Sequence, residues 1–353
     1  MPSPSHPAFT PPRGRRDVVS PWPLRPSLRR RPWGGSALAA LWPAGGVELE
    51  AGPGPIGEAW LAGPDNRVAA GPDAERRVSE LIARHGAGVL GEAPRSRYGD
   101  RFPLLLKLLD AAEPLSLQVH PDDAYARRFE AASGHLGKTE AWWVLRAEPG
   151  ASVWWGFRRP CGKDEVRAAA EAGRLSELLR TLPLAAGDVV VNPAGTVHAL
   201  GAGLVVFEVQ QASDLTYRLD DHGRVGADGR PRALHLDAAL AVADRETDRQ
   251  PAPEARITGS GRRELARTHA FVLEEVAPPP AGVNWRVDGT SFELVTHLPR
   301  AHDAPSGTLS WAGGRATVAP FASWLLPAGL GGVELGGGGP YARVRFPHGE
   351  STD

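Results

Sequence analysis

The segment GDVVVNPAGTVH, residues 187–198, carries the strongest architectural signal in this chain. Its run of valines favours an extended strand, because β-branched side chains pack well on a pleated sheet. Pro193 and Gly195 then supply the residue types that a tight turn requires. The chain returns as a second strand at His198. This pattern of strand, turn and strand predicts part of a β-barrel wall, with the histidine side chain directed into the barrel.

Most of the remaining chain also reads as short strands separated by glycine and proline turns. Many such strands at fairly regular spacing predict a mainly β protein, built as a barrel or a double-sheet jelly roll. Residues 74–90 and 163–182 are exceptions, because their apolar residues have helical spacing. The other predicted strands contain the segments WWVLRA, SVWWGF, LVVFEVQQ, FVLEEV, NWRVDG, FELVTHL and SWLLPAG.

A short internal repeat indicates two related β units. The segments NPAGTVHALGAG, residues 192–203, and LPAGLGGVELGG, residues 326–337, both run from a predicted strand into Pro-Ala-Gly. The second copy has Gly332 where the first has His198, and Phe321 stands five residues before the second segment, where Gly187 stands before the first. We therefore expect one unit with a functional histidine and one unit that is only structural.

The division between the two units is predicted at residues 243–264, a linker that is polar and rich in proline and glycine. Residues 1–20 are rich in proline and arginine without periodicity, which predicts a disordered tail. The expected organisation is a catalytic domain with helical segments over residues 21–242 and a smaller C-terminal domain over residues 265–353.

Composition narrows the class of protein. The net charge of -1 gives no support for a nucleic-acid partner, and no apolar run has the length of a membrane span. A single cysteine, Cys161, fits a reducing compartment, and the first residues lack the apolar segment of a secretory signal, so we expect a cytoplasmic protein. Only three of the 40 basic residues are lysines, so each lysine is a weak functional hint.

A second segment, SLQVHPDDA at residues 116–124, puts polar residues where an apolar strand is expected. Alternate residues of a strand share a face, so the side chains of Ser116, Gln118 and His120 point the same way. This row predicts a polar cavity inside the barrel.

The spacing Gly-x5-Pro-x-Gly-x2-His over residues 187–198 fits the second metal motif of the cupin superfamily. Gln118 and His120 stand where that superfamily has its first pair of histidines, and Glu140 follows after an inserted loop. Two neutral imidazoles, a carboxylate and an amide oxygen suit zinc or a similar divalent metal, with one position open for substrate or water. The alternatives are an ordinary surface or core histidine at 198, an ion pair at Glu140 and a turn residue at Gln118.

Eight segments together carry a more specific resemblance. The chain resembles the type I mannose-6-phosphate isomerases in their shorter bacterial form, closely over about residues 22–240. That resemblance implies two cupin units, which are jelly-roll β-barrels: the first binds metal and has helical insertions, and the second is without metal. The segments are, in order, RPWGG, IGEAW, FPLLLKLLDA, LSLQVHPDD, GKTEAWWVL, NPAGTVHALGAG, QQASDLTYRLDD and DGRPRALHLDAAL.

The resemblance also implies the roles of individual residues. One zinc ion per chain would be held by His120, Glu140 and His198, with Gln118 as a fourth ligand. The other implied site residues are Arg218 and Lys138, as catalytic and substrate-binding groups, Glu208, as a catalytic group, and Ser116, which is associated with the substrate phosphate.

The sequence leaves simpler explanations open for these last four residues. Lys138, Arg218 and Glu208 can each belong to an ion pair, and Ser116 can cap a turn. The chain also departs from the family after Arg218, where residues 219–222 read LDDH in place of a common aromatic pair.

The implied activity is interconversion of mannose 6-phosphate and fructose 6-phosphate through a cis-enediol, with a divalent metal polarising the carbonyl. Three alternatives remain: an iron-dependent cupin oxygenase, an isomerase of a related sugar phosphate, and a non-catalytic sugar-phosphate-binding cupin. The expected partner is a small sugar phosphate, with no nucleic acid and no membrane, and the chain is expected to be a monomer or a homodimer.

Overall fold

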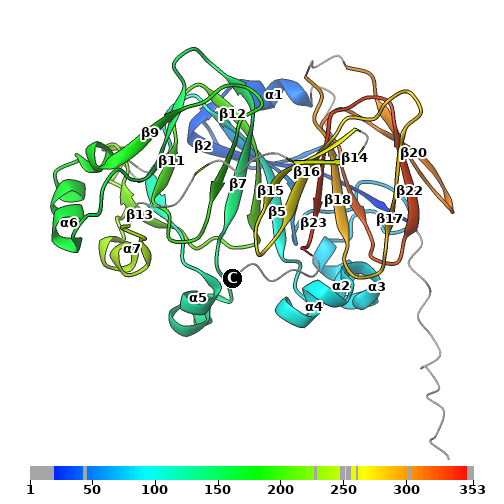
Figure 1. Ribbon diagram of the computed structural model, residues 1–353, viewed down its shortest axis with the longest axis horizontal. Helices are drawn as coiled ribbons and strands as arrows, with labels where there is room; N and C mark the ends of the chain where they lie inside the picture. Colours follow the sequence, from blue (N-terminus) through cyan, green and yellow to red (C-terminus); the bar gives the residue numbers. More distant parts are fainter. Residues whose placement is uncertain are drawn as a thin grey trace, which may run out of the picture.

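The computed structural model describes residues 20–42, 46–225, 229–246, 251, 256–259, 261–300 and 304–347. The chain forms two β-barrels side by side, each built from two sheets (Figure 1). The predicted mainly β fold with two barrel units is therefore confirmed. Residues 1–19 of the predicted tail and much of the predicted linker lie outside the described residues, so both remain predictions. In the described residues, no helix combines the length and apolar character that crossing a membrane requires.

The first barrel encloses an apolar interior between its two sheets. Leu109 and Trp142 project into it from one sheet, and Val153 and Leu200 project into it from the other. The first sheet has the order β10 (Val189–Asn192), β7 (Glu140–Ala147), β12 (Leu204–Gln211), β5 (Leu104–Ala111), β4 (Ile56–Ala62), β2 (Ser27–Gly35) and β3 (Glu48–Leu49). The facing sheet has the order β13 (Tyr217–Asp220), β6 (Leu117–Val119), β11 (His198–Leu200), β8 (Ser152–Phe157) and β9 (Leu179–Pro183).

The second barrel has its own apolar interior, with Val276 and Val295 from one sheet and Leu309 and Val333 from the other. The first of its sheets has the order β1 (Trp22–Leu24), β21 (Ser323–Leu326), β18 (Glu293–His297), β23 (Tyr341–Arg345), β16 (Val272–Val276), β15 (Arg262–Arg267) and β14 (Arg256–Gly259). The facing sheet has the order β17 (Val283–Val287), β22 (Gly331–Gly336), β19 (Gly307–Trp311) and β20 (Gly314–Val318).

The strand orders of the two barrels correspond. The run β10-β7-β12-β5-β4 matches β21-β18-β23-β16-β15, and β6-β11-β8-β9 matches β17-β22-β19-β20. The repeat seen in the sequence therefore extends over nine strands of each barrel. Gly187, which begins the first motif, has a φ of 97°, and Phe321 keeps a left-handed φ of 60° at the matching position without a glycine. The turn is thus retained where the ligand pattern is lost.

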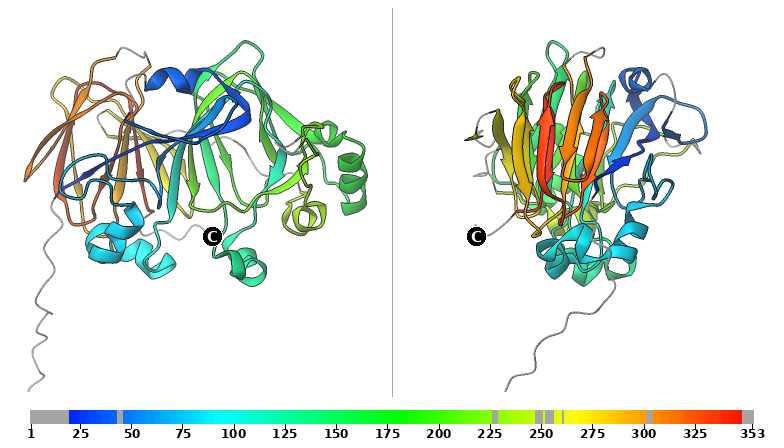
Figure 2. Two further views of the ribbon diagram at one scale, coloured as in Figure 1. Left: turned by 180° about the vertical axis from the view of Figure 1, so that it is seen from behind. Right: turned by 90° about the vertical axis from the view of Figure 1, so that its right-hand side faces the viewer.

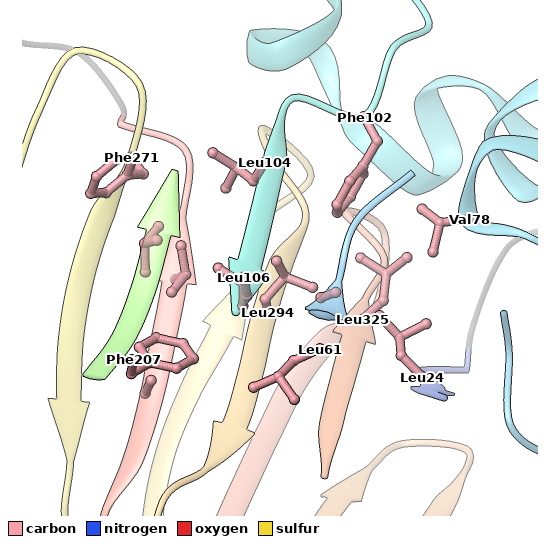
Figure 3. Close-up of a cluster of buried hydrophobic side chains, with 14 of the residues drawn as sticks. Leu24, Leu61, Val78, Phe102, Leu104, Leu106, Phe207, Phe271, Leu294 and Leu325 are labelled. Atoms are coloured by element: carbon pink, nitrogen blue, oxygen red, sulfur yellow. The ribbon is translucent and has the colours of Figure 1, made fainter. Parts of the chain in front are cut away.

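The two barrels share a hydrophobic core where their outer sheet faces meet (Figure 3). Burying each leucine or phenylalanine of this core contributes about 1.5–3 kcal/mol to stability. Strand β1 adds a second connection, because this N-terminal strand pairs with β21 of the second barrel. The labelled residues from the first barrel's sheet include Leu61, Leu104, Leu106 and Phe207, and those from the second barrel include Phe271, Leu294 and Leu325.

Helices cover one end of the molecule and the far side of the first barrel (Figures 1 and 2). Val166 of α6 and Leu240 of α7 pack on Leu117 and Val119, on the outer face of β6. Helix α5 and the 3-10 turn η1 lie in the predicted insertion between β6 and β7. The bounds are α1 (Ala37–Leu41), α2 (Val78–His85), α3 (Ala87–Leu90), α4 (Glu92–Tyr98), α5 (Asp123–Phe129), η1 (Ala131–Ser133), α6 (Lys163–Glu171), η2 (Leu175–Leu178) and α7 (Leu236–Val242).

Each predicted strand segment coincides with all or most of a strand of the structure, and the helix predicted over residues 74–90 is present from Val78 onward as α2 and α3. The helix predicted over residues 163–182 is wrong beyond Glu171. Gly173 takes a left-handed φ of 65°, which ends the helical path. Residues 179–183 form β9 instead, because pairing with β8 supplies their backbone hydrogen bonds.

Candidate active site

Three adjacent strands bring polar side chains to one face of the first barrel. Gln118 on β6 lies opposite His198 on β11 and opposite Arg218 on β13. Opposed residues of antiparallel strands share a face, so these three side chains lie on the inner side of the sheet. Leu117 and Val119 point to the other side, where they are buried under helices. The alternation predicted for β6 is therefore present.

His120, Glu140 and His198 meet inside the barrel, and each is at most 1% exposed. Their ligand atoms all lie within 4.8 Å of one another. Nε2 of His198 is 3.1 Å from one carboxylate oxygen of Glu140, and Nε2 of His120 is 3.6 Å from the other. Residues that are distant in the sequence thus form one compact triad.

Backbone carbonyls fix the orientation of both imidazole rings. Nδ1 of His120 lies 2.8 Å from the carbonyl oxygen of Leu215, and Nδ1 of His198 lies 2.8 Å from that of Thr196. A carbonyl oxygen only accepts, so each Nδ1 carries the proton and each Nε2 presents a lone pair to the triad. Burial, together with the positive charge of Lys138, lowers the pKa of His120 well below its ordinary value, which keeps that ring neutral.

The donor set fits a divalent metal ion. Burial alone would raise the pKa of Glu140, but the positive charge of Lys138 holds it well below its ordinary value, so the carboxylate is ionised. Nε2 of His198 is buried without a hydrogen-bond partner in the described residues and faces that carboxylate. Two acceptors in contact repel unless a cation lies between them. Two neutral imidazoles and one carboxylate form a set that zinc and similar ions prefer.

Lys138 lies directly against the triad. Its Nζ atom is 2.9 Å from Oε2 of Glu140 and 3.1 Å from Nε2 of His120. Its backbone amide donates to the carbonyl oxygen of Pro121 at 3.0 Å, which ties the end of the insertion to its beginning. Because Lys138 is only 6% exposed, its pair with Glu140 is buried and is not a surface salt bridge.

Arg218 lies at the edge of this cluster and is half-buried. Its Nη1 donates to the carbonyl oxygen of Ala233 at 2.9 Å, and its Nε has no partner in the described residues. Asp221 pairs instead with Arg224, at 2.8 Å, and with Arg232. Partial burial and the charge of Arg232 lower the pKa of Arg218. Within the described residues no carboxylate pairs with the Arg218 guanidinium, which leaves this group available to an anionic ligand.

Ser116 is buried at the start of β6, and its hydroxyl donates to Oε1 of Gln118 at 3.4 Å. Gln118 itself is half-buried on the inner face. The two side chains therefore line the same wall as the triad, and the serine contacts a side chain where the alternative was a turn cap.

Glu208 lies deeper in the barrel and does not touch the triad. Its Oε2 is 3.1 Å from Nζ of Lys107, and Nε1 of Trp142 donates to its Oε1 at 2.9 Å. The Trp142 ring in turn packs against the ring of His198, with 5.4 Å between centroids. Glu208 is thus half of a buried ion pair, and Trp142 connects it to the triad by hydrogen-bonding to Glu208 and packing on His198.

Lys107 is a residue that the sequence did not place in the site. Burial alone would lower its pKa, but Glu208, Glu58 and Glu140 raise it, so its ammonium stays charged. Burial likewise opposes ionisation of Glu58, but Lys107 and Arg31 lower the pKa of Glu58 to about 2. The scarcity of lysine was the one available signal, and only the pairing of β5 with β4 and β12 brings these charges together.

Comparison with known proteins gives a consistent family. A family model described as "Phosphomannose isomerase type I, catalytic domain" matches residues 22–139. The chain is 39% identical over 229 residues to "Mannose-6-phosphate isomerase ManA" of Bacillus subtilis, covering 64% of this chain and 68% of that protein. It is 36% identical over 248 residues to "Probable mannose-6-phosphate isomerase GmuF" of the same organism, covering 69% and 75%.

Solved structures agree with this result. The mannose 6-phosphate isomerase from Bacillus subtilis aligns with a TM-score of 0.77 at 29% identity, covering 92% of this chain and 99% of that one. A putative mannosephosphate isomerase from Archaeoglobus fulgidus aligns with a TM-score of 0.70 at 21% identity, which supports the fold alone. The fold is the cupin fold that the sequence resemblance implied.

Proposed function

The chain belongs to the type I mannose-6-phosphate isomerase family, and we propose that it interconverts mannose 6-phosphate and fructose 6-phosphate with the help of one divalent metal ion. The observation that supports this proposal most strongly is the buried triad of His120, Glu140 and His198. Lys138 satisfies one side of this triad, but the Nε2 lone pair of His198 faces the Glu140 carboxylate at 3.1 Å without a donor in the described residues, which is unfavourable unless a further cation binds there. Gln118, on the same inner face, is the proposed fourth ligand.

The proposed reaction moves one proton between C1 and C2 of the sugar and another between the two oxygens, through a cis-enediol. The difficult step is the loss of a proton from a carbon beside a carbonyl. When bound to the triad, zinc or a similar ion supplies a Lewis acid that polarises this carbonyl, a contribution of several kcal/mol. Because the substrate carbons exchange protons without an external oxidant, zinc is suitable as the native metal.

Lys138 is the proposed proton carrier at this site. Its Nζ lies within hydrogen-bond distance of both Glu140 and His120, so it sits beside any sugar oxygen that approaches the triad. A positioned side chain that exchanges a proton in the transition state contributes about 10²–10⁴-fold to a rate.

Arg218 and Ser116 are the proposed groups that bind the substrate. The unpaired Nε of Arg218 offers a charge-assisted hydrogen bond to a phosphate oxygen. Ser116, on the same inner wall as Gln118, offers a hydroxyl. Glu208 is proposed as a positioning residue, because its partner Trp142 fixes the ring of His198.

The test is turnover of defined sugar phosphates by the purified, zinc-loaded protein. Mannose 6-phosphate should yield fructose 6-phosphate, and Glu140→Gln should remove this activity. Glu334→Gln, an exposed carboxylate on β22, serves as the matched control and should be fully active. Turnover of a different sugar phosphate only would redirect the substrate assignment. Binding of sugar phosphate without any turnover would contradict the proposal and favour a binding role.

A further inference from the structure

The second barrel repeats the framework of the active site with different side chains. In the first barrel His198 on β11 lies opposite Gln118 on β6. In the second barrel Gly332, at the matching place of the repeat on β22, lies opposite Arg286 on β17. Val333, next to Gly332, faces the barrel interior, so Gly332 and Arg286 lie on the outer face of this sheet. The interior position of Gln118 is taken by Trp285, whose Nε1 donates to Glu293 at 2.8 Å, and that of His198 is taken by Val333. Val287, two residues after Trp285 and part of the interior core, corresponds in the same way to His120.

The glutamate position of the triad is retained. Glu140 lies opposite Asn192 at the end of β10, and Glu293 lies opposite Leu326 at the end of β21. Glu293 and Val295 share one face of β18, and Val295 belongs to the interior core of the second barrel. Glu293 thus projects into the barrel as Glu140 does in the first.

In the second barrel an arginine supplies the positive charge at this glutamate. Nε of Arg343 donates to Glu293 at 2.7 Å, and its Nη1 donates to Glu274 at 2.6 Å. All three side chains are buried. By strand register, Arg343 takes the place of Glu208, and Glu274 takes the place of Lys107. The buried ion pair is therefore present in both barrels with its two charges exchanged.

A cavity of about 430 Å³ opens at this end of the second barrel. That volume lies within the range of about 300–1,000 Å³ that is typical of small-molecule sites. Its described lining contains five arginines and four carboxylates. Since Glu293 and Arg343 belong to this lining and correspond to Glu140 and Glu208, the cavity lies at the second barrel's equivalent of the active site, with Arg286 at its rim.

The arginines that line the cavity differ in how closely a carboxylate approaches them. Arg343 satisfies Glu274 and Glu293, and Arg267 pairs with Glu264 at 2.6 Å. Nε of Arg345 comes only within 4.0 Å of Glu274. In the described residues neither Arg262 nor Arg286 forms an ion pair with a carboxylate. Five arginines against four carboxylates give the lining one net positive charge, and Arg262, Arg286 and Arg345 are its arginines without a close carboxylate partner in the described residues.

We propose that this cavity is a second ligand site, which binds the phosphate group of a small molecule through Arg262, Arg286 and Arg345. Planar guanidinium groups match the oxygens of a phosphate and form charge-assisted hydrogen bonds to it. A metal ion does not suit the cavity, because Arg343 and Arg267 already engage its three glutamates. The inference does not depend on isomerase activity, because none of these arginines belongs to the first barrel.

The experiment is equilibrium dialysis of the zinc-loaded protein against radiolabelled inorganic phosphate and, in a separate arm, glucose 6-phosphate. The double variant Arg262→Gln/Arg286→Gln should bind one equivalent less than the wild type, or bind that equivalent at least about tenfold more weakly for each arginine removed. Arg315→Gln, an exposed arginine on β20 outside the cavity, is the matched control and should bind as the wild type does.

The two arms distinguish the sources of phosphate. If the double variant loses binding of both phosphate and glucose 6-phosphate, the site recognises the phosphate group itself. If it loses binding of glucose 6-phosphate alone, the site also contacts the sugar. Isomerase turnover measured on the same samples should be unchanged in the double variant, which also shows that it is folded. If Arg262→Gln/Arg286→Gln and the single variant Arg286→Gln both bind phosphate and glucose 6-phosphate like the wild type, the proposal is wrong.

Discussion

Lys138 makes two contacts that are hard to explain as structure alone, because its ammonium group lies against both a carboxylate and an imidazole of the triad. The substitution Lys138→Ala should lower kcat by about 10²–10⁴-fold, since the proposed proton carrier is removed. Steady-state assays of zinc-loaded protein measure this effect. Lys163→Ala, at an exposed lysine that begins α6, is the control and should leave kcat unchanged. Full activity of Lys138→Ala would remove this residue from the mechanism.

The buried pair of Glu208 and Lys107 makes a different prediction, about stability. Glu208→Gln leaves the Lys107 ammonium buried beside a neutral partner, and breaking such a pair costs about 3–5 kcal/mol. Urea unfolding should show this loss. The double variant Lys107→Met/Glu208→Met should recover much of it, because no charge is then left unpaired. A loss below about 1 kcal/mol in Glu208→Gln would show that Glu58 alone balances Lys107.

At the scale of elements, the insertion between β6 and β7 controls where Lys138 lies. A Cβ atom at Gly137 would come within 2.5 Å of the backbone nitrogen of Asp123 and 2.6 Å of the carbonyl carbon of Asp122. Backbone atoms cannot yield as a flexible side chain would, so Gly137→Ala must displace the neighbouring Lys138.

We expect Gly137→Ala to reduce kcat by at least about tenfold, because small displacements of a catalytic group are costly. Gly162→Ala is the control, since a Cβ atom there meets open space. Circular dichroism should show both variants folded. Equal kcat values for the two variants would show that the insertion does not position the lysine.

The strands of the site could be predicted from the sequence because their signals are local. Alternation reveals which residues of β6 share a face, and Pro193 and Gly195 mark the turn before β11. The helix predicted over residues 163–182 failed beyond Glu171, because strand pairing and a left-handed glycine outweigh the helix propensity of leucine. Non-local pairing leaves no such local trace.

The buried ion pairs inside the barrels could not be predicted from the sequence either. Lys107 and Glu208 are directly opposed on β5 and β12 but distant in the chain. The correspondence of Glu293 with Glu140 also emerges only from sheet register, because the insertion that separates His120 from Glu140 is absent from the second unit. Sequence spacing therefore identified the triad, and the structure identified what surrounds it.

At the scale of the whole molecule, the shared core predicts that the two barrels unfold together. Leu294 on β18 faces the first barrel, whereas its neighbour Val295 faces the interior of the second. Leu294→Ala should destabilise the protein by about 2–5 kcal/mol. Isomerase activity and far-UV circular dichroism should be lost in one coincident transition in denaturant, both in this variant and in Val295→Ala. Two separate transitions would show that the barrels are independent domains.

Activity as a function of bound metal is the most direct test of metal-dependent isomerisation at the triad. Protein stripped by a chelator, with the absence of metal verified by elemental analysis, should be inactive on mannose 6-phosphate. Activity should then rise in proportion to added zinc and reach its maximum at one equivalent per chain. The variant His198→Ala should neither retain that equivalent nor recover activity. Full turnover by metal-free protein, or by His198→Ala without bound zinc, would contradict the account.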